Sequence, residues 1–330
     1  MRHWLIVVFT LLFSVGCGLG LWYGAYLVLP APAGEDVVVV VPKGTGVRGI
    51  GTLLAEQGLL KNDLRYLVYV ALSGTGGRLQ AGEYRLPRGK TPPEILELLV
   101  SGRTLRHRVT IPEGLTVAQI ARLFAQGDWV SEDQFRALAS DRDFVRRHGV
   151  DAASLEGYLF PETYTLSRGE TSTEGILTAM VRRYREVWQD LGNADEAHGL
   201  GRHQLLILAS VVEKETGVAE ERPLIARVFL NRLALGMRLQ SDPTVIYGIA
   251  DFDGNLRTAD LRRKTPYNTY AISGLPAGPI CNPGRAALEA VLHPVDSPAL
   301  YFVSKNDGTH EFSTNLKDHN SAVHRYQRGR

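Results

Sequence analysis

The chain has 330 residues, of which 44% are hydrophobic, and its formal net charge is only +2. This length is enough for about two folded units with substantial cores. The near-neutral charge, without a basic run interleaved with aromatic residues, argues against nucleic acid as a partner. The two cysteines and nine histidines form neither a disulfide framework nor a metal-ligand spacing, so we expect no metal and no cofactor.

The N-terminal segment is predicted to cross a membrane once. No charged residue occurs from Trp4 to Leu29, which is long enough to span a hydrocarbon core of about 30 Å as a helix. The apolar stretch is also longer than that of a cleaved signal peptide. One arginine precedes it and two acidic residues follow it, so the positive-inside bias places the N-terminus in the cytoplasm and the remainder outside. A lipoprotein anchored through Cys17 is the alternative, although Ser14 stands where a leucine is expected.

A spaced pattern of four residues occurs three times after a short linker. It consists of a proline, a glycine two positions on, an isoleucine eight on and a leucine eleven on, beginning at Pro42, Pro87 and Pro112. Each copy follows a β-rich run (37–41, 84–86 and 109–111), and its isoleucine and leucine lie on one helix face. Proline cannot donate a ladder hydrogen bond and glycine adopts positive φ. Each copy is therefore predicted to be a strand, a tight turn and a short amphipathic helix.

This turn and helix resemble the LysM domain, a small carbohydrate-binding fold that recognises N-acetylglucosamine polymers. If the resemblance extends to function, residues 36–125 would form a LysM-like repeat region that binds glycan. The alternative is that the copies are packing units without a ligand.

The second half of the chain contains further helices around one aromatic-rich loop. A charged and helical stretch over 131–150 leads to this loop at 155–164, which carries two carboxylates. An amphipathic helix follows, with its apolar stripe on the core side. The stripe consists of Ile176, Leu177, Met180, Val181, Tyr184, Val187 and Trp188.

The segment from His203 to Thr216 is predicted to be a buried helix that ends at Gly217. At 100° per residue, Glu215 lies in line with the apolar face, whereas Glu213 lies away from it. Burial disfavours the charged form of a carboxyl and raises its pKa, as proton donation near neutral pH requires. The alternative is that Glu215 is a helix-end carboxylate paired with Arg222 or Arg227.

The loops after this helix are rich in tyrosine, asparagine and proline, and they contain few charges. Aromatic faces stack on sugar rings and amides bond sugar hydroxyls, so this composition favours a glycan ligand. Asp242 is predicted to be an N-cap with Pro243 at the first helical position. The runs 300–303 and 310–313, on either side of Asn306 and Gly308, predict a β-hairpin.

Several long motifs occur in one order: EKET at the helix end, MRLQSDPTVIYG, TPYNTY, GLPAGPI before NPG, and the terminal F-x-TNLxxHN from Phe312 to Asn320. Together with LEGYLFPETY, they resemble the endolytic murein transglycosylases, the MltG or YceG-like family, over nearly the whole chain. Cys281 departs from the pattern, since a small residue is expected in that loop.

The resemblance implies a lyase that cleaves the glycosidic bond between N-acetylmuramic acid and N-acetylglucosamine in nascent peptidoglycan and leaves 1,6-anhydro ends. The family's catalytic glutamate, followed by serine or threonine at a helix end, maps onto Glu215 rather than Glu213. The candidates for orienting substrate are Thr216, Gln240, Tyr247, Tyr267, Asn268, Asn282 and Asn315. Coupling to glycan polymerases such as penicillin-binding proteins is also implied.

Three other readings remain open at this point. A muramidase-type hydrolase would need a second carboxylate, Glu162 or Asp242. A non-catalytic scaffold would bind glycan without Glu215. A cysteine amidase would use Cys281 with His293 or His319.

The expected architecture is α+β in three parts. Residues 1–35 form a cytoplasmic tip, a transmembrane helix and a linker, residues 36–125 form the LysM-like region, and residues 126–330 form a mixed α+β catalytic domain. The enzyme is expected in the cell membrane, the inner membrane of a two-membrane cell, with its catalytic domain on the extracytoplasmic side.

Overall fold

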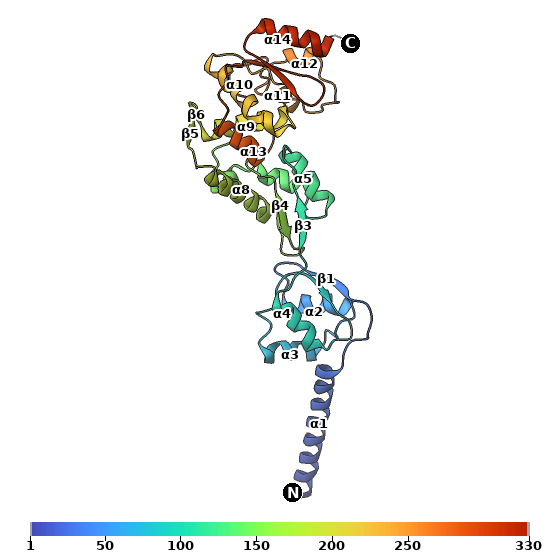
Figure 1. Ribbon diagram of the computed structural model, residues 1–330. Coiled ribbons are helices and arrows are strands. Elements are labelled where there is room, and N and C mark those ends of the chain that lie inside the picture. The colour runs from blue at the N-terminus through green and yellow to red at the C-terminus, as the bar shows by residue number, and fades with distance from the viewer. Residues whose placement is uncertain (1, 329–330) are drawn as a thin grey trace. The chain divides into compact units, whose positions relative to one another are not determined.

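The computed structural model describes residues 2–328 and contains two compact units (Figure 1). The first comprises Met1–Val109 with Thr165–Thr171, and the second comprises Thr110–Tyr164 with Ser172–Arg330. The division falls within β3 (His107–Thr110) and β4 (Thr163–Leu166), which pair in a two-stranded sheet. The helix of the third repeat copy therefore belongs to the second unit.

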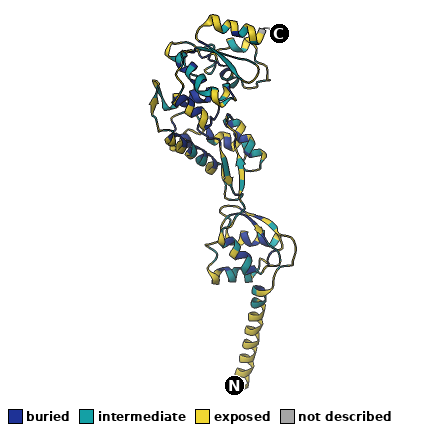
Figure 2. Ribbon diagram, in the orientation of Figure 1, coloured by how far each residue is buried: buried dark blue, intermediate teal, exposed yellow. Residues whose placement is uncertain are grey.

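The first unit begins with α1 (Arg2–Val28), the predicted long apolar helix. Residues His3–Val28 have a hydropathy of 2.3, so the helix is long and apolar enough to cross a membrane. Figure 2 shows that nearly all of α1 is exposed. Residues 23–27 near its end are less exposed, and Tyr26 among them is buried in the core of the first unit.

The remainder of the first unit is a two-stranded antiparallel sheet covered by helices. β1 pairs with β2 in a register that sets Val39 opposite Tyr84. Val39 and Val41 are buried while Val38 and Val40 are exposed, as expected for a strand with one face on a core. The elements are β1 (Val37–Val41), α2 (Val47–Glu56), α3 (Leu64–Ser73), β2 (Gly82–Leu86) and α4 (Pro92–Ser101).

Each of the three repeat copies forms a strand, a turn and a helix, as predicted. The turn glycines Gly44, Gly89 and Gly114 have φ of 87°, 74° and 75°, values that favour glycine. The helices α2, α4 and α5 follow these turns. Thr91 and Thr116 begin the last two with capping boxes, which satisfy free N–H groups of the first helical turn.

The second unit is mostly helical and contains the two small sheets β5–β6 and β7–β8 together with parts of β3 and β4. Its core surrounds α9, whose residues from Leu205 to Val212 are all buried. All seven apolar residues of the predicted stripe on α8 are buried as well. The elements after β3 are α5 (Val117–Gln126), α6 (Glu132–Ala139), α7 (Arg142–Arg147), β4, α8 (Thr173–Asp190), β5 (Glu196–Ala197), β6 (Leu200–Gly201), α9 (Arg202–Glu215), η1 (Ala219–Glu221), α10 (Arg222–Ala234), α11 (Asp242–Tyr247), α12 (Thr258–Arg262), α13 (Arg285–Leu292), β7 (Tyr301–Ser304), β8 (His310–Ser313), α14 (Leu316–Val323) and η2 (His324–Arg328).

Two helix ends differ from the predictions near the candidate site. α9 ends at Glu215 because Thr216 turns into an extended conformation with φ −141°, and Gly217 does not adopt positive φ. The N-cap of α11 is Ser241 rather than Asp242, and Ser241 makes no side-chain cap bond. Its hydroxyl bonds Glu215 instead. The predicted hairpin is confirmed, with Asn306 and Gly308 in left-handed conformations between β7 and β8.

Candidate active site

Glu215 is the last residue of α9, and it lines a cavity of about 430 Å³. The polar residues around this cavity come from α9, α10, α11, the loop before α11, the loop between α12 and α13, the β7–β8 hairpin, α14 and η2. They include Glu215, Arg232, Gln240, Asp242, Tyr270, His310 and His319. A volume of this size is within the range of small-ligand sites. The cavity therefore brings a buried carboxyl together with several hydrogen-bonding groups.

Burial raises the pKa of Glu215 to about 7. The hydroxyl of Ser241 donates to Oε1 of Glu215, which favours the carboxylate and opposes part of this rise. The negative charge of Asp242 raises the pKa further, and the positive charge of Arg232 lowers it. Glu215 is thus poised near neutral pH, where a single carboxyl can both give and accept a proton.

Arg232 is a buried cation that lines the same cavity as Glu215, and it forms no ion pair with a carboxylate among the described residues. Its guanidinium donates to the carbonyls of Leu300 and Leu239, both at 2.7 Å, and to that of Arg238 at 3.3 Å. It also lies over the ring of Tyr301, 5.1 Å from the centroid. These bonds hold a fixed positive charge near Glu215.

Glu213, two residues earlier on α9, has different partners. Its carboxylate accepts a hydrogen bond from the N–H of Gly284 at 3.0 Å and lies 3.8 Å from Arg222. Its side chain is only 6% exposed. The ion pair considered as the alternative for Glu215 therefore forms at Glu213. Since α9 is buried on all sides from Leu205 to Val212, helix periodicity alone does not separate the two glutamates.

Two of the seven substrate candidates lie next to Glu215. Gln240 lines the cavity and has φ of 53°, an uncommon conformation for a residue other than glycine. Such backbone strain is often found at functional sites. Thr216 is buried, and its Oγ1 accepts from the N–H of Val218 at 2.9 Å and lies 3.5 Å from Glu221.

Three candidates instead belong to a second buried cluster around Glu156. Tyr247 donates to Glu156 at 3.2 Å and Asn282 donates to it at 3.0 Å, while the N–H of Val117 donates to both carboxyl oxygens. The ring of Tyr267 packs against that of Tyr247, with centroids 4.8 Å apart. Burial raises the pKa of Glu156 to about 7, although these hydrogen-bond donors favour the carboxylate and oppose part of the rise. Within residues 2–328, none of this cluster lines the cavity at Glu215.

The remaining two candidates bond the protein's own backbone. The amide of Asn268 is buried and donates to the carbonyls of residues 260, 261 and 263. Asn315 is the N-cap of α14, where its side chain accepts from the N–H of Asp318 at 3.0 Å. Both therefore position backbone in the described structure, and neither lines the cavity.

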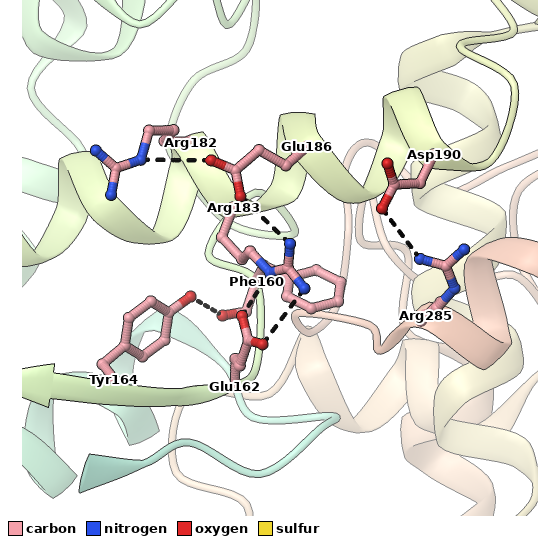
Figure 3. A network of polar contacts seen from close by, with 8 residues as sticks. All are labelled: Phe160, Glu162, Tyr164, Arg182, Arg183, Glu186, Asp190 and Arg285. Atoms are coloured by element: carbon pink, nitrogen blue, oxygen red, sulfur yellow. Dashed lines mark hydrogen bonds and ion pairs between the residues drawn. The ribbon is translucent and has the colours of Figure 1, made fainter. Parts of the chain in front are cut away.

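The two carboxylates considered for a hydrolase differ in position. Figure 3 shows Glu162 beside Arg183 of α8, and these side chains form an ion pair at the protein surface. Asp242 lines the cavity and accepts from the hydroxyl of Tyr270 at 2.6 Å. Only Asp242 of this pair is therefore placed to act together with Glu215.

Cys281 lies in an environment unsuited to nucleophilic attack. It is fully buried, and its thiol donates to the carbonyl of Ser210 at 3.3 Å. Burial raises the pKa of this thiol well above its ordinary value, whereas a nucleophile requires the thiolate. The structure therefore gives the amidase reading no support.

Arg232, Ser241, Tyr270, Glu221 and His310 were not among the sequence candidates. They come from separate parts of the chain and meet only in the folded unit. The one local signal was the neighbourhood of Gln240 and Asp242, since Ser241 lies between them in the QSDP motif.

A buried carboxyl with a raised pKa in a polar cavity is typical of enzymes that break glycosidic bonds. Residues 39–325 match the model of the YceG-like family, and the chain belongs to this family.

Curated relatives cover most of the chain. The endolytic murein transglycosylase of Bacillus subtilis (strain 168) is 34% identical, over 92% of this chain and 89% of that protein. The endolytic murein transglycosylase of Streptococcus pneumoniae (strain D39) is 31% identical over 96% of this chain, which spans 63% of that longer protein. The crystal structure of a yceG-like protein from Listeria monocytogenes superposes with a TM-score of 0.57 at 32% identity, covering 87% of this chain and 99% of that one.

Proposed function

We propose that this protein is an endolytic lytic transglycosylase that cleaves peptidoglycan glycan strands and so terminates their elongation. The observation that carries the proposal is the carboxyl of Glu215, which is buried in a polar cavity with its pKa raised to about 7. The names of its relatives in Bacillus and Streptococcus support the same substrate and reaction.

In the proposed mechanism Glu215 acts twice. Its protonated carboxyl donates to the glycosidic oxygen between N-acetylmuramic acid and N-acetylglucosamine, which breaks the bond to the muramyl C1. The resulting carboxylate then takes the proton of the muramyl C6 hydroxyl, whose oxygen attacks C1 and closes a 1,6-anhydro ring. No water is consumed, and Glu215 ends in its starting protonation state.

The neighbours of Glu215 support both steps. The bond from Ser241 and the charge of Arg232 favour the carboxylate formed after the first step. The carboxylate of Asp242 lines the same cavity and would stabilise positive charge that develops at C1. In a hydrolase Asp242 would instead activate water, so the two reactions differ in their product ends. Mass spectrometry of digested peptidoglycan separates them, since anhydro ends are lighter by one water than reducing ends.

We further propose that α1 is a single-pass membrane anchor with the N-terminus in the cytoplasm. The proposal rests on the hydropathy of 2.3 over His3–Val28 and on the charge asymmetry around this helix. Some reporter enzymes work only outside the cytoplasm, and such a reporter fused after Arg330 should therefore be active. Activity of a cytoplasm-specific reporter at the same position would contradict the anchor topology and remove access to the substrate.

The repeat copies in the first unit are proposed to bind glycan in the manner of LysM domains. The support is their shared strand, turn and helix, with the turn glycines in left-handed conformations. In the full-length Glu215→Gln protein, N-acetylglucosamine oligomers should slow amide hydrogen exchange in residues 42–50 and 87–95. Protection confined to the cavity residues would assign the copies a packing role only. Coupling to glycan polymerases stays a prediction of the family resemblance.

A further inference from the structure

His310 is one of the polar residues that line the cavity at Glu215, and its position is set by Glu221. The Nδ1 atom of His310 lies 2.7 Å from Oε2 of Glu221, and the backbone N–H of His310 donates to Oε1 at 2.8 Å. The two side chains are only 11% and 13% exposed. One carboxylate therefore holds both the backbone and the ring of His310.

Aromatic neighbours restrict the ring further. The ring of Phe302 meets that of His310 edge to face, with centroids 5.4 Å apart, and that of Phe312 lies at 6.4 Å. Phe302 and Phe312 are directly opposite each other in the β7–β8 hairpin. The imidazole is therefore fixed by a regular element as well as by Glu221.

The bond to Glu221 determines what the ring presents to the cavity. An ionised carboxylate only accepts hydrogen bonds, so the proton of the neutral imidazole belongs on Nδ1. His310 lines the cavity, and its Nε2 makes no hydrogen bond to any residue from 2 to 328. The neutral ring therefore leaves the lone pair of Nε2 available to a ligand.

Thr216, the C-cap residue of α9, connects this pair to the end of that helix. Its hydroxyl lies 3.5 Å from Oε2 of Glu221, the oxygen that also bonds the ring. Its Oγ1 accepts from the N–H of Val218, which leaves the hydroxyl proton free to point at Glu221. The residue directly after Glu215 thus helps to place Glu221.

We propose that His310 is a substrate-binding residue, whose Nε2 accepts a hydrogen bond from a sugar hydroxyl of the glycan in the Glu215 cavity. Glu221 and Thr216 are positioning residues that fix the tautomer and direction of the ring. The inference rests on the proposed function, because its ligand is the same glycan. It gives Thr216 a role that does not require contact with substrate.

Two substitutions in the full-length protein separate binding from structure. In His310→Asn the amide nitrogen occupies the place of Nδ1 and keeps the bond to Glu221, but nothing replaces Nε2. In His310→Gln the amide reaches the place of Nε2 and the bond to Glu221 is lost. We expect His310→Asn to keep the melting temperature and to lower kcat/KM at least tenfold, and His310→Gln to retain more activity at a lower melting temperature.

Binding is measured separately from turnover by adding each substitution to Glu215→Gln and titrating purified glycan strands. His310→Asn should weaken the Kd about tenfold, the loss of one good hydrogen bond. Unchanged binding and unchanged kcat/KM in His310→Asn would overturn the inference. A loss of activity and binding in His310→Gln alone would also overturn it, because that result assigns His310 and Glu221 a structural role.

Glu221→Gln tests the tautomer independently. The amide nitrogen in place of Oε2 would donate to Nδ1, which moves the ring proton to Nε2 and turns the acceptor in the cavity into a donor. We expect weaker glycan binding with the fold retained, and binding equal to that of the parent protein would count against the inference. If the parent enzyme produces no anhydro ends, the proposed reaction fails, whereas the binding comparison still decides the role of His310.

Discussion

The Glu215→Gln variant is expected to fold normally and to lose glycan cleavage by several orders of magnitude. Glutamine keeps the shape of the side chain, and its carbonyl can still accept from Ser241. It cannot donate a proton and take one back. Removal of acid or base help typically costs about 10²–10⁴ in rate, and here one group serves both steps. The measurement is release of anhydro-muramyl fragments from purified strands, compared with that of the parent enzyme.

Two matched controls accompany this variant. Glu213→Gln changes a buried carboxyl on the same helix that bonds Gly284 and Arg222, so its effect on cleavage should be much smaller. Glu162→Gln removes a surface ion pair with Arg183 and does not change the cavity lining, so its effect on cleavage should also be small. Full activity of Glu215→Gln, or a greater loss in Glu213→Gln, would refute the assignment. Products with reducing ends in place of anhydro ends would show that the enzyme is a hydrolase and not a lytic transglycosylase.

Local patterns in the sequence were sufficient for most of the secondary structure. The stripe on α8, the three turns and the hairpin rest on residue spacing and on glycine conformations, which act within a few positions. The end of α9 was placed within two residues, although the expected cause was wrong. Gly217 does not cap the helix, because Thr216 leaves it first.

The candidate site was only partly predictable because it is assembled from distant segments. Tyrosine and asparagine suit a sugar, but they equally suit a buried carboxylate, and Tyr247 and Asn282 bond Glu156 rather than line the cavity. Arg232 and His310 stand in no local motif, and their roles depend on bonds made across the fold. The family motif therefore predicted that Glu215 is the catalytic glutamate, a role that stays a proposal, and local spacing missed the residues that surround it.

Raising the pH through neutrality should reduce both the activity and the stability that depend on Glu215. Its pKa in the folded protein is raised to about 7 from an ordinary value of 4.5, chiefly by burial. The first step needs the protonated carboxyl, so kcat/KM should fall about tenfold per pH unit above pH 7, or roughly 100-fold at pH 9. Constant activity from pH 6 to pH 9 would contradict the role of Glu215 as the acid.

The sign of the stability change follows from proton binding in the two states. Between pH 4.5 and pH 7 the folded state keeps the proton of Glu215 while the unfolded chain loses it, so the free energy of unfolding falls as the pH rises. The full decrease is on the order of 3 kcal/mol, at about 1.4 kcal/mol per pKa unit. Glu156 titrates over the same window, so the measurement is the difference in urea unfolding between the parent protein and Glu215→Gln. From pH 5 to pH 8 the free energy of unfolding of Glu215→Gln should rise relative to that of the parent protein. If the two free energies change equally with pH, Glu215 is ionised throughout this range.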